Sequence, residues 1–201
     1  MTRNRTLGRL DLAVLLGTAC AVTLANIAAF GMECETLRQD VVRLHILANS
    51  DSASDQQIKL RVRDRILNDV GSVFASPESQ QDAKQVAEQN LPAIEAAARD
   101  ELRRCGIDEP VRAELCHMYF NTREYEAGSL PAGDYDAVRV TIGAGAGKNW
   151  WCVIYPPICL GSAMAEGNPE LEEIEHLNSE PLFKPKLAVV ELFESLRNTD
   201  S

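Results

Sequence analysis

The feature that most constrains this chain is an uncharged run from Leu12 to Met32, which follows three arginines at positions 3, 5 and 9. As a helix with about 1.5 Å of rise per residue, such a run reaches roughly 30 Å, the thickness of a bilayer's hydrocarbon core. Basic residues ahead of an apolar stretch are typical of export signals, and the basic end stays in the cytoplasm. We therefore expect everything after Glu33 to lie outside the cytoplasm.

Residues 1–32 are thus predicted to be either a signal peptide or a membrane anchor. Ala29-Phe30-Gly31 has the small-x-small form of a cleavage site, although it lies late in the run. The length of the run equally permits an uncleaved anchor through residues 12–32. Both alternatives stay open, and residues 33–201 are predicted to form one extracytoplasmic domain of ordinary globular composition.

The negative net charge of the chain restricts the classes of partner that it can bind. The net charge is −10, and removing the three Arg and one Asp of residues 1–32 makes it −12. Binding to phosphate groups needs clustered Lys and Arg, which this chain lacks. We therefore expect no nucleic-acid partner and no attraction of the folded part to an anionic membrane surface.

Hydrophobic periodicity after residue 40 predicts one strand, two helices, three strands and a last helix. The expected strands are 41–48, 111–120, 135–142 and 150–155, and the expected helices are 54–74, 82–105 and one that begins at Pro185. Short turns between the last three strands suggest an antiparallel meander. The predicted fold is α+β, with an antiparallel sheet of about four strands packed against two to three helices and preceded by the N-terminal signal or anchor helix. Residues 161–183 are expected to form a mobile loop.

The glycine-rich segment Gly143–Lys148 does not match a nucleotide-binding motif. A P-loop would need glycine in place of Ile142 and Ser or Thr in place of Asn149. We expect these glycines to make a flexible hairpin connection, in which positive φ is tolerated.

No enzyme signature is present in the sequence. The three histidines are scattered, and His-Glu-x-x-His, Gly-x-Ser-x-Gly and Cys-x-x-Cys motifs are all missing. His45 is expected to be structural, and we expect no cofactor, no metal and no enzymatic activity. Two other classes stay open: a secreted hydrolase of envelope polymers with His45 and Asp51 as its acid–base pair, and an envelope scaffold.

Both tryptophans of the chain, Trp150 and Trp151, stand side by side on a predicted strand. Adjacent strand residues face opposite sides, so one ring should enter the core and the other should meet a helix layer or solvent. An exposed tryptophan is a favoured anchor for a partner, although both rings could also be core.

The exported part has five cysteines, which is an odd number: Cys34, Cys105, Cys116, Cys152 and Cys159. Pro156-Pro157 and the short spacing leave room for a turn that joins the last two, so we predict a Cys152–Cys159 disulfide. A zinc site at this pair would need two further ligands and is the weaker alternative. Pairing of Cys105 with Cys116 is a weaker second expectation.

Two long blocks of the chain resemble the stage II sporulation protein R family. They comprise Arg43-Leu-His-Ile-Leu-Ala-Asn-Ser-Asp51 with Asp55-Gln-Gln-Ile-Lys59, and Leu130-Pro-Ala-Gly-Asp-Tyr135 with Asn149-Trp-Trp-Cys-Val153, Pro156-Pro157 and Cys159. The closing Val189-Val-Glu-Leu-Phe193 and the apolar N-terminus extend the similarity. The chain departs from the family pattern in its short linker before the last helix and in its extra cysteines at 34, 105 and 116, which affects only the redox details.

The resemblance implies a messenger of endospore formation without catalytic groups. Members are exported from the forespore into the space between forespore and mother cell, where they are implied to activate a membrane-embedded aspartic protease. That protease removes the pro-sequence of sigma factor E. On this chain the candidate contacts with the protease are Arg43, the turn Asn49-Ser50-Asp51, Asn149, Trp150 and Trp151.

Overall fold

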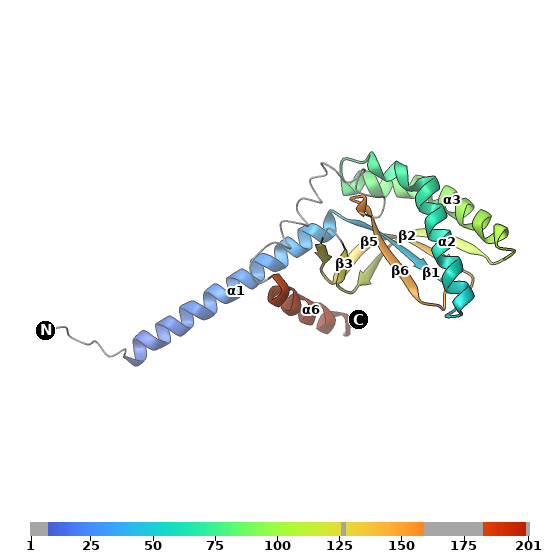
Figure 1. The fold of residues 1–201 in the computed structure, drawn as a ribbon. Coiled ribbons are helices and arrows are strands. Elements are labelled where there is room, and N and C mark those ends of the chain that lie inside the picture. The colour runs from blue at the N-terminus through green and yellow to red at the C-terminus, as the bar shows by residue number, and fades with distance from the viewer. Residues whose placement is uncertain (1–7, 126–127, 159–182, 200–201) are drawn as a thin grey trace.

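A long helix and a folded body make up the computed structural model, which describes residues 8–125, 128–158 and 183–199 (Figure 1). The helix is α1 (Arg9–Gln39). The other elements are β1 (Val42–Leu47), α2 (Ala53–Val70), the 3-10 helix η1 (Gly71–Ala75), α3 (Gln80–Arg104), β2 (Val111–Phe120), β3 (Arg123–Tyr125), β4 (Gly128–Leu130), β5 (Gly133–Ile142), β6 (Asn149–Tyr155) and α6 (Phe183–Thr199). The predicted α+β class and the apolar N-terminal helix are confirmed. The expected mobile loop, apart from residue 183, lies outside the described residues.

The main sheet is mixed, with strand order β2-β5-β1-β6. β1 pairs in parallel with β5 and antiparallel with β6, and β2 pairs antiparallel with β5. The expectation of a strictly antiparallel sheet with a three-strand meander is therefore wrong, because β1 lies between β5 and β6. The first five residues of β1 are buried, which suits a strand covered on both faces.

Each face of this sheet is covered by a separate layer. On one face, alternate residues of β1 and β5 pack against the buried sides of α2 and α3, whose apolar residues recur every three to four positions. On the other face lie the end of α1, the helix α6 and residues of the small β3–β4 hairpin. Figure 1 shows α2 and α3 above the sheet and α6 below it.

The end of α1 belongs to the core of the body. Phe30, Cys34 and Leu37 are fully or almost fully buried beneath α6 and the sheet. Arg38 on the same turn donates hydrogen bonds to the Ala132 carbonyl oxygen and to Glu35. The helix is thus continuous across the predicted boundary between residues 32 and 33, and its last turns are held by the domain.

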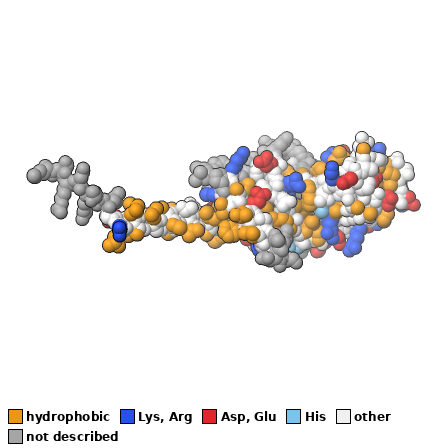
Figure 2. Space-filling model, turned by 90° about the horizontal axis from the view of Figure 1, so that it is seen from below, with side chains coloured by type: hydrophobic (Ala, Val, Ile, Leu, Met, Phe, Trp, Pro, Cys, Tyr) orange, Lys and Arg blue, Asp and Glu red, His pale blue; other side chains and the backbone are white. Residues whose placement is uncertain are grey.

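The rest of α1 projects away from the body. It is long and apolar enough to cross a membrane, judged by length and composition alone. Figure 2 shows hydrophobic side chains along most of this stem, whereas charged side chains of both signs are scattered over the body. A signal or anchor role fits this surface, because large apolar side chains from Leu10 to Leu24 are exposed.

Candidate functional site

The turn Asn49-Ser50-Asp51 holds the connection between β5 and β6. The Asn49 side chain accepts a hydrogen bond from the Ala144 N–H at 2.9 Å, and the Asp51 carboxylate accepts one from the Lys148 N–H at 2.7 Å. Ser50 donates to Asp55 at 2.5 Å, near the start of α2. The three residues therefore have structural partners, and their contact with another protein stays a prediction.

The glycine-rich segment crosses the end of β1 and does not form a hairpin, since β5 and β6 are not neighbours. Gly143 and Gly145 adopt positive φ values of 56° and 62°. A Cβ on Gly147 would meet the backbone carbonyl of Ser50. Glycine is thus needed here for close backbone approach, and the segment is held by hydrogen bonds to the turn at residues 49–51.

Arg43 is fully buried in a cage of aromatic rings. Its guanidinium carbon lies 4.1 Å from the Phe120 ring centroid and 4.8 Å from that of Tyr135, and Nη2 donates to the Tyr125 hydroxyl at 2.7 Å. Nε and Nη1 have no hydrogen-bond partner among the described residues. Burial lowers the pKa of this guanidinium. The side chain is not part of the surface in this conformation, so its predicted contact with a partner would require the cage to open.

His45 and Trp151 stack against each other on the same face of the sheet, 3.9 Å apart between ring centroids. Trp151 also meets Phe120 edge to face at 4.8 Å. Burial lowers the pKa of His45 to about 4, which outweighs the opposing effect of Asn149. His45 is therefore neutral at neutral pH, and it forms no hydrogen bond with Asp51, the other member of the hydrolase pair considered above.

Trp150 faces the opposite side of the sheet from Trp151, as the alternation of a strand predicts. Both rings are partly buried, and the guanidinium of Arg63 lies 5.2 Å from the Trp150 ring. Trp150 lines a groove of about 690 Å³ between α2, β3 and β6, together with Leu67, Tyr125 and Ile158. Asn149, at the start of β6, is exposed. Of the predicted contact residues, Trp150 is the one that lines this groove, and Asn149 and Asp51 are exposed outside it.

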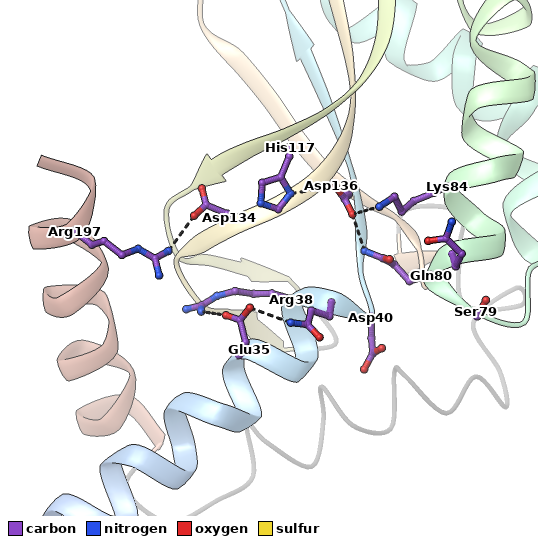
Figure 3. A pocket seen from close by; sticks show the side chains of 12 residues that line it. Glu35, Arg38, Asp40, Ser79, Gln80, Lys84, His117, Asp134, Asp136 and Arg197 are labelled. Atoms are coloured by element: carbon purple, nitrogen blue, oxygen red, sulfur yellow. Dashed lines mark hydrogen bonds and ion pairs between the residues drawn. The ribbon is translucent and has the colours of Figure 1, made fainter. Parts of the chain in front are cut away.

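A second, strongly polar pocket of about 920 Å³ lies where the end of α1 meets α3, β5 and α6 (Figure 3). Asp136 at its centre accepts hydrogen bonds from Gln80 at 3.1 Å and is paired with Lys84 at 2.7 Å and with His117 at 3.1 Å. Partial burial would raise the pKa of Asp136, but Lys84 and His117 outweigh it and lower that pKa.

Sequence reasoning did not identify this pocket. His117 and Asp136 meet only because β2 and β5 pair in one register, which places the two residues opposite each other. Among the described residues no serine or cysteine side chain is hydrogen-bonded to His117. The cluster is therefore a network of ion pairs, and it lacks the nucleophile next to a base that covalent catalysis needs.

The cysteines match the prediction in part. Cys152 is disulfide-bonded, whereas Cys20, Cys34, Cys105 and Cys116 are free thiols. Cys159 lies outside the described residues, so its pairing with Cys152 stays a prediction, and the weaker Cys105–Cys116 pairing is wrong. Across the described part of the chain no group of three or more His, Cys, Asp or Glu side chains could hold a metal ion.

Comparisons with known proteins identify the family. The chain is 36% identical over 135 residues to the stage II sporulation protein R of Bacillus subtilis (strain 168), a match that spans 67% of this chain and 60% of that protein. No solved structure matches the chain. The sequence profile of stage II sporulation protein R (spore_II_R) matches residues 38–165, which include β1, the turn at residues 49–51 and β6. The chain therefore belongs to the stage II sporulation protein R family.

Proposed function

We propose that this chain is an intercellular messenger of endospore formation, exported from the forespore, that activates a membrane-embedded aspartic protease of the mother cell. The protease would then remove the pro-sequence of sigma factor E. Membership of the family supports this proposal, because it is consistent with a role in sporulation. The apolar helix α1 is compatible with export or anchoring.

The messenger would act through a surface and without a catalytic group. Its buried histidine is neutral and stacked on Trp151, and the ion pairs around Asp136 include no nucleophile among the described residues. A protein that only docks can change the activity of an enzyme by binding one of its conformations, or its dimer, more tightly than the alternative. The size of the activation is then limited by that difference in affinity.

The groove beside Trp150 is the docking surface that we propose for an extracytoplasmic segment of the protease. It combines an aromatic ring and the aliphatic side chains of Leu67 and Ile158 with the charges of Arg63, Asp64 and Glu124. Tryptophan and arginine are enriched among residues that dominate binding energy. The groove lies along the edge strand β6, between α2 on one face of the sheet and β3 on the other, and none of its described lining residues belongs to α6.

Co-expression of the full chain with the cognate protease and its sigma-factor precursor, in a host that lacks all three, tests this function. We expect precursor cleavage to require the chain. Trp150→Ala should reduce cleavage by at least about tenfold, as expected for a loss of about 1.4 kcal/mol or more at a binding anchor. Arg112→Ala is the matched control, because this side chain is 75% exposed on the distant strand β2. Cleavage that proceeds equally without the chain would rule out the proposed function.

A further inference from the structure

Helix α6 is apolar on two sides, and only one of them is covered. Leu187 and Val190 face the core together with Phe30 and Leu37. Leu192, Phe193 and Leu196 lie on another side and are 60%, 64% and 58% exposed. Among the described residues outside α1, the other exposed large apolar side chain is Leu60, at 38%. A helix of a water-soluble domain normally keeps such a second side polar.

The position of α6 indicates what covers this side. The ammonium group of Lys186, in the first turns of α6, lies 5.3 Å from the centre of the Phe30 ring on α1. Phe30 is two residues from Met32, where the uncharged run of α1 ends. If α1 spans a bilayer, the hydrocarbon core ends at about this level, because roughly 20 residues cross it. α6 therefore starts at the level of the membrane surface, beside the point where α1 enters the body (Figure 1).

The charges of α6 allow contact with lipid headgroups. The helix carries Lys184, Lys186 and Arg197 against Glu191 and Glu194, so it lacks the acidic excess of the chain as a whole. Glu194 is also engaged internally, 3.3 Å from Arg38 and 2.8 Å from Arg197. Long basic side chains beside an apolar stripe are typical of helices that lie in the membrane interface.

We propose that α1 is retained as an anchor and that α6 lies on the surface of the same membrane, with Leu192, Phe193 and Leu196 among the lipid headgroups and upper acyl chains. The anchor is suited to be retained because its last turns, from Phe30 to Arg38, are part of the core of the body. Two attachments fix the orientation of the body, whereas one helix alone would leave it free to tilt. This inference requires no partner protein and does not depend on activation of a protease.

Methyl NMR of the full chain in lipid nanodiscs that hold one copy each tests the proposal. Two paramagnetic agents are compared: a lipid with a nitroxide on its acyl chain and a gadolinium chelate dissolved in the water. We expect the methyl signals of Leu192 and Leu196 to be broadened by the nitroxide lipid and shielded from the chelate. Leu60 on α2 is the internal control, and its methyl signals should show the opposite response.

Two substitutions that add the same charge sharpen the test. Leu196→Glu places a carboxylate in the apolar stripe, and Ser195→Glu places one on the neighbouring exposed position. The Leu192 methyl signals should lose their broadening by the nitroxide lipid in the first variant and keep it in the second. Both sites are exposed, so the fold should be retained, which the unchanged signals of Leu37 would verify.

Two results would overturn the proposal. In the first, Leu192 and Leu196 are broadened by the chelate and unaffected by the nitroxide lipid, so that the stripe faces water. In the second, both agents leave them unaffected, so that the stripe is shielded by protein and not by lipid.

Discussion

Burial of the imidazole ring, more than its neighbours in the sequence, determines the protonation state of His45. The ring is 2% exposed, stacked on Trp151, and neither ring nitrogen has a hydrogen-bond partner with good geometry among the described residues. An imidazolium in this place would lose its hydration without gaining a counter-charge, and Arg43 and Arg139 add repulsion. The physical consequence is a histidine that favours the neutral form well below its ordinary titration range.

This shift makes the stability of the body depend on pH in a definite direction. The pKa of His45 falls from 6.5 to about 4 on folding, so the unfolded chain binds a proton more readily and acid destabilises the fold. The stabilisation is complete above the unfolded pKa and declines as the pH falls through 6.5 towards 4. We expect a loss of about 2 kcal/mol in the free energy of unfolding between about pH 7.5 and about pH 5.

Chemical denaturation of wild type and His45→Phe at both pH values measures this effect. Phenylalanine keeps the stacked ring and removes the titrating group, so the variant should lose less stability than wild type over the same interval. An identical loss in both proteins would show that His45 does not carry the pH dependence.

Arg43 illustrates what the sequence could not show about a single side chain. In β1 the polar positions 43 and 45 alternate with Val42, Leu44 and Ile46, a pattern typical of a strand with one solvent-exposed face. That face is instead covered by α1, α6 and the β3–β4 hairpin, and the cage around Arg43 comes from Phe120, Tyr125 and Tyr135 on three other strands. Such a cage depends on strand pairing, which local periodicity does not encode.

Among the secondary structure elements, the sequence was most informative about the helices on one face of the sheet. The three- and four-residue spacing of Ile58, Val62, Ile66 and Val70 predicts α2 and its buried side, and both are confirmed. The four strands of the main sheet were also located, but the short strands β3 and β4 were missed, and the order of the main sheet was not predicted because β1 inserts between two strands that are consecutive in the sequence. Insertion of a parallel strand depends on long-range contacts, and turn lengths alone suggested the simpler meander.

The last turns of α1 are expected to stabilise the body directly. Phe30→Ala should lower the free energy of unfolding by about 3–5 kcal/mol and Leu37→Ala by about 2–5 kcal/mol, because both side chains are almost completely buried. Met32→Ala is the matched control on the same helix, since its side chain is 67% exposed and the change should stay below about 0.5 kcal/mol. Denaturation of the full chain in detergent micelles measures all three. Equal effects of the three substitutions would contradict the assignment of these turns to the core.

The two helices that we propose to contact the membrane lie on one side of the molecule. α1 and α6 share one face of the sheet, whereas α2 and Trp150 lie on the other, and the groove runs along the edge strand β6 between α2 and β3. No described residue of α1 or α6 lines the groove, so contact of α6 with a membrane would leave the groove uncovered by these two helices. This arrangement suits a messenger that is anchored in one membrane and reaches a protease in the membrane opposite.

Cleavage between two populations of vesicles tests the proposed messenger role most directly. One population carries the full chain, and the other carries the protease with its extracytoplasmic face outward and the sigma-factor precursor enclosed. The account predicts that mixing the two starts precursor cleavage, that Trp150→Ala slows it and that Arg112→Ala leaves it unchanged. Cleavage at the same rate with empty vesicles in place of those that carry the chain would contradict it.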